Sequence, residues 1–440
     1  MLSPQELYPL VLTWLQALEV CSQRTALAAL AHLVVALLCG QSLRPCALMR
    51  ALLSPVPVPA RQRYKRVARF WERPWLTPAW LTPRLVRATL ALVEPDGRGP
   101  TAGLTHVVLD SVRCGLWDVF TLGVVWHGRV VPLSWAALPY PWPKGQVTPT
   151  VCRLVQQVAA VWPDGRPAHL VADRAFPGQK LFRTLRGVHW GWTGRLRAPL
   201  SVTVDGAVCT VRDLLARARP RGWTVWAGAY GQGSKVLPAT LVVGRGLPVW
   251  PLHQRTEASQ RPRAARPAER VRTRRYRYAS VTATDSWVAL CTTHATWQAA
   301  VRSYRRRWAT EGSYRDAQSG WDGQHGWDLE PVLTHARSAA QVEHVVGLWA
   351  LGALLQTWIG AQVAHGPAAV RAVAAQWTTT GRLSVWAQGQ CALREPQLTA
   401  WLRVTLQQGA AQVARVPPVA LVPPTALDTE RPAHSRQRAA

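Results

Sequence analysis

The chain has 440 residues, which is enough for a large buried core and two or three domains. Its 52 lysines and arginines against 23 aspartates and glutamates leave a net charge of +29, far more than solubility requires. This predicts a polyanionic partner, with nucleic acid favoured over a ribosomal or membrane-surface role. The eight cysteines are scattered without a CxxC pair, which excludes a disulfide framework and an ordinary zinc site.

Residues 1–100 are expected to be helical. Apolar residues recur at helical spacing over 7–18 and over 26–38, and Gly40 is the predicted C-cap before a further helix at 42–53. The run 26–39 has 14 residues, too few to span a bilayer, and the N-terminus has no basic signal-peptide region. We therefore expect a soluble protein, and the scattered cysteines indicate the reducing cytoplasm. Its first helices form either a helix-turn-helix or a plain bundle.

A basic and aromatic segment follows at RQRYKRVARFWERPW. Cationic side chains alternate with Tyr64, Phe70 and Trp71, a combination that suits phosphate contacts and stacking on DNA. The alternative is an amphipathic helix with a solvated basic face. The predicted DNA-binding residues in this segment are Arg61, Arg63, Lys65 and Arg66.

Short apolar runs predict a sheet from residue 105 onward. Strands are expected at 105–111, 120–128 and 129–136, with a tight turn between the second and the third. A helix at 150–161 and a strand at 168–176 come next. This order predicts a mixed α/β sheet, not a doubly wound parallel one.

The second half alternates β-rich, basic and helical segments. Residues 190–295 are β-rich, and an arginine- and proline-rich loop at 254–279 interrupts them. Helices are expected at 297–319 and 335–359. The final stretch, 416–440, has the composition of a disordered basic tail.

Three acidic residues stand out in so basic a chain. Asp110 and Asp173 lie at the predicted carboxyl ends of strands, where side chains reach a crevice above a sheet. Glu311 lies in the strongly basic helical segment 304–311. Each carboxylate taken alone is more often structural, for example as part of an ion pair.

Phosphoryl transfer gives a reason to combine the three carboxylates. Two Mg²⁺ ions about 3.5–4 Å apart activate the attacking oxygen and stabilise the leaving one. Magnesium prefers oxygen ligands, so two or three carboxylates suffice, with Mn²⁺ as a substitute. Histidines and cysteines are not required, and none is spaced here as another metal site.

Several motifs now support a family resemblance. Asp110 in VVLDS, Asp173 in DRAFPG, and the spacing of Tyr304, Arg307 and Glu311 resemble the blocks of the insertion sequence four family of DDE transposases. The chain continues with YRDAQS, similar to the family's aromatic-Arg-Asp-x-Lys-Ser. The resemblance covers roughly residues 100–360 and implies that Asp110, Asp173 and Glu311 are catalytic metal ligands.

The spacing of the carboxylates fits the same family. Asp173 lies 63 residues after Asp110, and Glu311 lies 138 residues after Asp173. The resemblance implies an α/β protein with an RNase H-like mixed sheet, interrupted by a β-rich insertion and preceded by a helical DNA-binding domain. The expected ranges are 1–100 for the helical domain, 101–195 and 296–365 for the core, 196–295 for the insertion, and 366–440 for a helical region with a disordered tail.

The glutamate block also implies DNA contacts. Tyr304 and Arg307 are expected on one helix face with Glu311, against the DNA backbone; surface packing is the alternative. Arg174 is a further predicted DNA-binding residue. One departure concerns Gln318, because the family has a lysine there that would contact a terminal phosphate. Glutamine can only form a neutral hydrogen bond, and Arg315 is the candidate substitute.

The family resemblance implies a base-stacking role for a tryptophan of the β-rich segment. In the family an insertion-domain tryptophan stacks on a flipped base. Trp223, Trp226, Trp250 and Trp287 are the candidates, and core packing is the alternative for each. The segment 231–235 lacks the Walker spacing and is expected to be a hairpin turn.

The predicted function is cut-and-paste DNA transposition. The partners would be double-stranded DNA, as terminal inverted repeats and as target, and a second copy of the chain in a two-fold complex. Two alternatives stay open: an RNase H-like nuclease or resolvase without strand transfer, and a catalytically impaired DNA-binding protein derived from a transposase.

Overall fold

The computed structural model describes residues 2–52, 58–70, 76–94, 99, 101–232, 236–245, 287–318, 326–377 and 383–417. The predicted loop 254–279, Trp71, Trp250 and nearly all of the C-terminal tail lie outside these residues.

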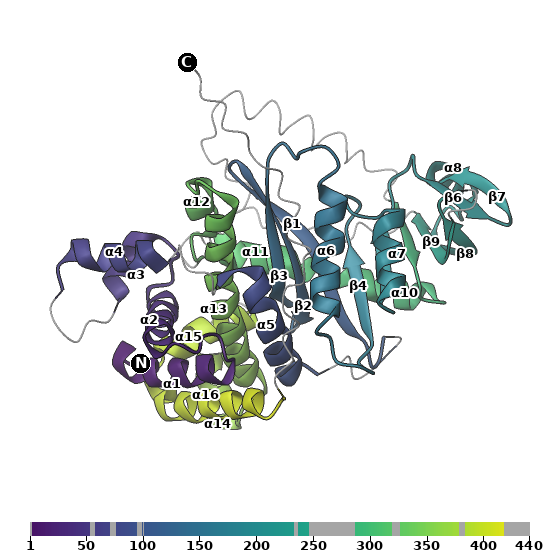
Figure 1. The fold of residues 1–440 in the computed structure, drawn as a ribbon. Coiled ribbons are helices and arrows are strands. Elements are labelled where there is room, and N and C mark those ends of the chain that lie inside the picture. Colours follow the sequence, from purple (N-terminus) through teal and green to yellow (C-terminus); the bar gives the residue numbers. More distant parts are fainter. Residues whose placement is uncertain are drawn as a thin grey trace, which may run out of the picture. The chain divides into compact units, whose positions relative to one another are not determined.

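The protein has a mixed α/β fold with a ten-stranded sheet (Figure 1). The strand order is β3-β2-β1-β4-β5-β10-β9-β8-β6-β7. The β1–β4 and β4–β5 pairs are parallel, whereas β2–β3, β5–β10 and the pairs from β10 to β7 are antiparallel. This confirms the mixed sheet. The strands are β1 (Thr105–Cys114), β2 (Trp117–Trp126), β3 (Arg129–Pro139), β4 (Ala168–Ala172), β5 (Gly191–Arg195), β6 (Ser201–Val204), β7 (Ala207–Thr210), β8 (Gly222–Tyr230), β9 (Leu237–Arg245) and β10 (Val288–Thr292).

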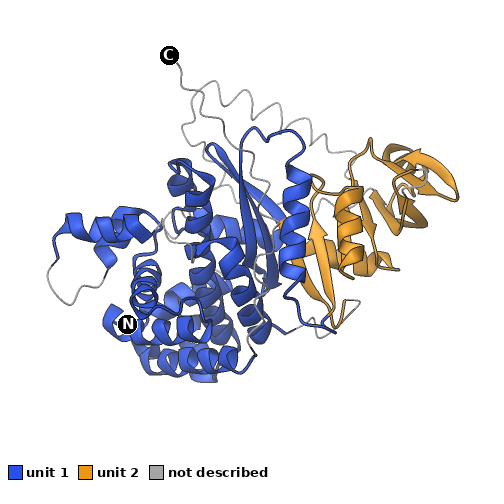
Figure 2. Cartoon of the chain, viewed as in Figure 1, with its two compact units in different colours: residues 1–95, 110–166, 308–440 blue, residues 96–109, 167–307 orange. Residues whose placement is uncertain are grey.

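The chain divides into two compact units (Figure 2). Unit 1 comprises residues 1–95, 110–166 and 308–440, and unit 2 comprises 96–109 and 167–307. The helices of unit 2 are α7 (Gln179–Gly187), α8 (Val211–Arg217) and α10 (Trp297–Arg305). Those of unit 1 are α1 (Pro4–Ala17), α2 (Arg24–Gly40), α3 (Pro45–Ala51), α4 (Ala60–Phe70), α5 (Pro78–Leu92), α6 (Val147–Ala159), α11 (Trp308–Gln318), α12 (Leu329–Thr334), α13 (Ala339–His365), α14 (Ala368–Ala375), α15 (Val385–Arg394), the 3₁₀ helix η4 (Pro396–Leu398) and α16 (Thr399–Ala414). The five domain ranges expected from the sequence stay a prediction.

The core of unit 1 is built around α13. This helix packs on β3 and α15 and also contacts α2, α5 and α16. Among the described residues α13 is long and apolar enough to cross a membrane, and α2 with α3, bent by 100°, passes the same test as a pair. All of the apolar window of α13 is buried within the fold, as in the core helix of a soluble protein.

The N-terminal helices form where the apolar spacing predicts them. A capping box between Ser3 and Glu6 starts α1. The predicted glycine cap of α2 is wrong, because Gly40 is the last helical residue and Gln41 takes the left-handed conformation, with φ 52°. The Trp327 indole Nε1 donates to the Gln41 side chain at 2.7 Å, which stabilises this turn.

The hairpin of β2 and β3 confirms the predicted tight turn. His127 and Gly128 join the strands with φ values of 45° and 75°, the positive angles of a two-residue type I′ turn. Further along, Gly231 follows β8, which pairs with β9 in antiparallel fashion. The predicted turn at 231–235 falls between these two strands, but its residues 233–235 lie outside the described part of the chain.

The helix predicted at 297–319 is two helices. The chain leaves α10 after Arg305 and enters α11 at Trp308. Between them the amides of Arg306 and Arg307 donate to the carbonyls three residues earlier, which is the tight bonding of a helix end. The expectation that Tyr304, Arg307 and Glu311 share one helix face is therefore wrong.

Candidate active site

Two of the three predicted carboxylates directly follow residues that pair between β1 and β4. The two strands pair in parallel from Thr105 with Ala168 up to Leu109 with Ala172. Asp110 directly follows Leu109, and Asp173 directly follows Ala172. The predicted position of Asp110 needs correction, because β1 continues to Cys114 and Asp110 lies within it, at the level where β4 ends.

Asp173 has a buried tyrosine as its partner in unit 2. The Tyr304 hydroxyl donates to Asp173 Oδ1 at 3.1 Å, and the Tyr304 side chain is only 4% exposed. Burial first, and the nearby Asp173 charge second, raise the pKa of Tyr304 to about 12. The charges of Arg195 and Arg307 act in the opposite direction. The phenol therefore stays protonated at neutral pH and can donate to the carboxylate.

Arg195 is a site residue that was not predicted from the sequence. Ala172 of β4 pairs with Gly194 of β5, so Arg195 continues β5 as Asp173 continues β4. Its Nε is buried and has no hydrogen-bond partner among the residues that the structure describes. The sequence feature that could have indicated Arg195 is its position as the one charged residue, at the end of the strand GWTGR.

The loop after β4 is also held by its neighbours. Arg197 Nε donates to the carbonyl of Arg174 at 2.8 Å, which ties the start of the DRAFPG block to the end of β5. The Arg174 side chain is exposed, and its role in DNA binding stays a prediction. Phe176 of the same block is buried at 9% exposure. The block therefore combines an exposed cation with an apolar anchor.

In unit 1, the helix that carries Glu311 runs close to Asp110. Tyr314, three residues after Glu311, is buried, and its hydroxyl lies 2.5 Å from Thr121 Oγ1 on β2. The pKa of Tyr314 is raised well above its usual value, chiefly by burial and next by the charge of Asp110. This electrostatic coupling indicates that α11 passes near Asp110.

Two polar contacts fix α11 on the start of β3. Arg129 Nε donates to Asp316 Oδ2 at 2.5 Å, and the backbone N–H of Val130 donates to Ser313 Oγ at 2.7 Å. A Cβ at Gly312 would lie 2.8 Å from the Arg129 guanidinium, so the glycine permits the close approach. These contacts hold α11, the helix that carries Glu311, in place on β3.

The three carboxylates are divided between the units. Asp110 and Glu311 belong to unit 1, whereas Asp173 belongs to unit 2, and all three are half-buried. Within the described part of the chain, no three histidine, cysteine, aspartate or glutamate side chains form a group that could hold a metal ion. The donor atoms that the three residues offer are carboxylate oxygens, the ligands that Mg²⁺ prefers.

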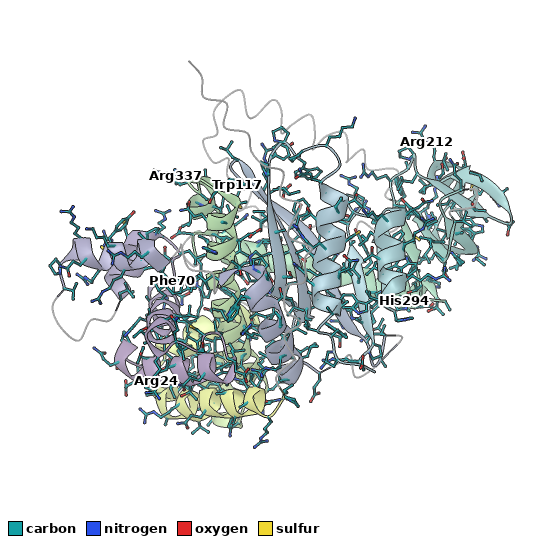
Figure 3. All side chains as sticks on the ribbon, in the orientation of Figure 1. Arg24, Phe70, Trp117, Arg212, His294 and Arg337 are labelled. Atoms are coloured by element: carbon teal, nitrogen blue, oxygen red, sulfur yellow. The ribbon has the colours of Figure 1, made fainter. Side chains whose placement is uncertain are left out.

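The predicted DNA-binding residues of the N-terminal region lie on α4. Arg61, Lys65 and Arg66 are exposed and Arg63 is half-buried, while Val67 on the same helix is buried. Of the aromatic residues, Tyr64 is 45% exposed, but Phe70 (Figure 3) is 4% exposed and is not available for stacking. On α11, Arg315 and Gln318 are both half-buried.

The tryptophans of the β-rich segment differ in their surroundings. Trp223 stacks on Trp297, with ring centroids 5.8 Å apart and an interplanar angle of 11°. Trp226 and Trp287 are half-buried. None of these positions singles out a base-stacking residue, so that role stays a prediction.

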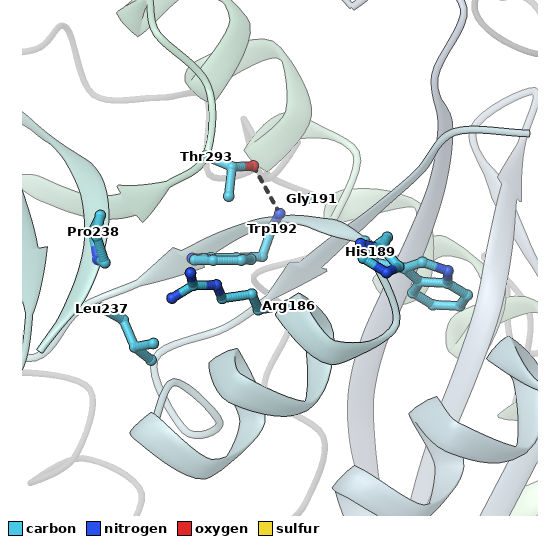
Figure 4. Close-up of a pocket in the computed structure, with 8 residues that line it drawn as sticks. Arg186, His189, Gly191, Trp192, Leu237, Pro238 and Thr293 are labelled. Carbon is cyan, nitrogen blue, oxygen red and sulfur yellow. Dashed lines mark hydrogen bonds between the residues drawn. The ribbon is translucent and has the colours of Figure 1, made fainter. Parts of the chain in front are cut away.

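Unit 2 also contains a pocket of about 460 Å³ (Figure 4). Trp192 forms part of its lining and stacks on Phe182, while its backbone N–H donates to Thr293 Oγ1 at 3.1 Å. None of the predicted site residues lines this pocket. Its other lining side chains include Arg186, His189, Leu237 and Pro238.

No protein-family model and no curated protein matches this chain.

Proposed function

We propose that this protein is a DNA transposase of the DDE type with an RNase H-like core. In this proposal Asp110, Asp173 and Glu311 hold two Mg²⁺ ions, with Mn²⁺ as a substitute. The observation that carries the proposal is the β1–β4 register, in which an aspartate follows each of the paired residues Leu109 and Ala172. The position of α11, close enough to Asp110 for the two to interact electrostatically, supports Glu311 as the third ligand.

The carboxylates fit such ions by their chemistry. They are half-buried oxygen donors, and side chains with basic groups lie near Asp173. When bound, the ions would activate an oxygen nucleophile and stabilise the leaving oxygen of a phosphodiester.

The arginines near Asp173 would bind the DNA backbone. Arg195 is half-buried at the end of β5, and a guanidinium is a suitable donor to a phosphate oxygen. Arg307 lies close enough to Tyr304 to affect its ionisation. Together with the basic face of α4, these groups account for part of the +29 charge as a DNA-binding surface.

Assembly and location follow from the same proposal. Two transposon ends must be held together, so a homodimer with two-fold symmetry is expected on DNA. Terminal inverted repeats and a target duplex are the DNA partners, and the cytoplasm is the proposed location.

The test is cleavage and joining of the DNA that flanks the coding sequence. With Mg²⁺, the purified protein is expected to nick this DNA at inverted repeats and to join the ends to a target plasmid. Asp110→Asn, Asp173→Asn and Glu311→Gln are each expected to lower the rate at least about 100-fold, because each removes a charged ligand. DNA affinity, measured by fluorescence anisotropy, should change little.

A matched control is Asp205→Asn. Asp205 is an exposed carboxylate that lies 3.7 Å from Arg217, and its φ of 52° is one that asparagine tolerates. This variant should cleave at the parental rate. Nicking without joining would favour the nuclease alternative, and DNA binding without nicking would favour the impaired DNA-binding protein. Unchanged cleavage in Glu311→Gln would remove Glu311 from the site.

A further inference from the structure

Tyr304 is attached to a firmly held part of unit 2. It lies at the carboxyl end of α10, which packs on β4 and β5. The preceding residue, Ser303, is fully buried, and its hydroxyl lies 2.9 Å from His106 Nε2 and 2.7 Å from His294 Nε2. The backbone that carries Tyr304 is therefore held by the packing of α10 on the sheet and by the hydrogen bonds of Ser303 to two histidines.

Asp173, in contrast, has just left the sheet. β4 ends at Ala172, so Asp173 lies outside the strand ladder, and its backbone carbonyl accepts from the Phe176 N–H at 3.1 Å. An aspartate side chain has two rotatable torsions, and holding it in one rotamer costs entropy. The hydrogen bond from the Tyr304 hydroxyl, at 3.1 Å, ties one carboxylate oxygen.

The direction of that hydrogen bond is set by chemistry. A carboxylate accepts hydrogen bonds only, so the phenol must donate. The guanidinium of Arg195 interacts with the same hydroxyl, but it can only donate and does not compete for the proton of the phenol. The Tyr304 proton is thus directed to Asp173.

We propose that Tyr304 is a positioning residue, whose hydroxyl orients the Asp173 carboxylate for metal binding. This inference rests on the proposed function, because it assumes that Asp173 is a metal ligand. It replaces the expectation that Tyr304 contacts the DNA backbone, since the side chain is 4% exposed and its hydroxyl is bonded to the carboxylate. Pre-orientation of a ligand by a neighbouring donor strengthens metal binding.

The test compares the parent with Tyr304→Phe, which removes one hydroxyl and keeps the buried ring. Mn²⁺ occupancy of the full-length protein on flanking DNA is measured by electron paramagnetic resonance, alongside the Mn²⁺ concentration that gives half-maximal nicking. Both the Mn²⁺ dissociation constant and that concentration are expected to rise about 10-fold, the lower end for groups that orient a metal ligand. DNA affinity without metal should stay at the parental value.

Tyr230→Phe is the matched control. Tyr230 is another buried tyrosine of unit 2, and its hydroxyl donates to the Pro177 carbonyl at 3.3 Å instead of to a carboxylate. Its loss should leave Mn²⁺ affinity unchanged. In an Asp173→Asn background, Tyr304→Phe should have no further effect on Mn²⁺ binding, because the two changes act on one interaction.

Each outcome separates the inference from the proposed function. Equal Mn²⁺ binding in the parent and Tyr304→Phe would overturn the positioning role, even if both proteins cut DNA. Weaker DNA binding with unchanged Mn²⁺ affinity would also overturn it and restore the backbone contact. If the parent binds Mn²⁺ through Asp173 and Tyr304→Phe weakens it, but no DNA is cut, the inference stands and the transposase proposal fails. Absence of Asp173-dependent Mn²⁺ binding in the parent would overturn both.

Discussion

Asp316 gains a structural role that its sequence motif does not reveal. It belongs to the block that follows Glu311, and in the fold it forms an ion pair with Arg129 at 2.5 Å. Burial raises the pKa of the Asp316 carboxyl, and the charge of Arg129 opposes that change. The pair holds α11, and thereby Glu311, on the edge of β3.

Removal of Arg129 should therefore destabilise the fold. Arg129→Gln leaves the Asp316 carboxylate 12% exposed and without its cation, and we expect the free energy of unfolding to fall by about 2–3 kcal/mol. The expected loss is smaller than the cost of breaking a fully buried ion pair, because the Arg129 side chain is 20% exposed. Urea unfolding followed by tryptophan fluorescence measures the change.

The double variant provides the control for this pair. Adding Asp316→Asn to Arg129→Gln removes the uncompensated charge and should restore about half of the loss. A loss below about 0.5 kcal/mol in Arg129→Gln would show that the pair behaves as an ordinary surface ion pair.

At the scale of elements, α13 and α15 approach each other through glycines. A Cβ on Gly360 would lie 1.6 Å from the Val385 carbonyl oxygen, and a Cβ on Gly389 would lie 2.2 Å from the Gln356 carbonyl oxygen. No real Cβ fits at these distances, so each helix needs a glycine where the other crosses it. The packing of the unit 1 core depends on this crossing.

Gly360→Ala is thus expected to cost about 2–4 kcal/mol of unfolding free energy, because the two backbones must move apart. In an isolated helix, alanine is about 1 kcal/mol more favourable than glycine. The expected loss would therefore occur despite a gain in helix propensity. Gly187→Ala at the end of α7 is the matched control, since nothing lies within 4 Å of the position that its Cβ would take. Chemical denaturation should show Gly187→Ala as stable as the parent or more so; equal stability of Gly360→Ala would contradict the close crossing.

At the scale of the whole molecule, a histidine network links stability to pH. In unit 2, His169 stacks on His294 with ring centroids 4.1 Å apart, and His106 lies edge-on to His169 at 5.8 Å. Burial lowers the pKa of His294 to about 4. Burial, followed by the charges of His294 and His106, lowers the pKa of His169 well below its usual value.

The sign of the pH dependence follows from these lowered values. Below about pH 6.5 the unfolded chain binds protons that the folded imidazoles resist, so stability is complete above pH 6.5 and falls toward pH 4. Between pH 7 and pH 5 we expect a loss on the order of 1–3 kcal/mol, a range reduced because His294 is partly exposed. Urea unfolding at a series of pH values measures it. His294→Gln keeps a group that can bond Ser303 but does not titrate, and it should flatten the dependence; an unchanged slope would exclude His294.

Much of the fold could be predicted because its signals are local. Two short apolar runs predicted the β2–β3 hairpin, and His127-Gly128 predicted its turn. The helix break after Arg305 was missed, because its arginines continue a helical pattern. The sequence placed Asp110 at the end of a strand, but β1 continues to Cys114. It is β4, the neighbouring strand, that ends at this level.

The sequence alone determined the excess of positive charge, the positions of the first three strands and of the N-terminal helices, and an aspartate directly after Leu109 and after Ala172. Only the tertiary structure decided that Tyr304 bonds Asp173 across 131 residues and that Arg129 bonds Asp316 across 187. Periodicity and turn residues report the local backbone and the side of an element that is buried. The partner of a buried polar group is set by the packing of distant elements, which local patterns do not specify.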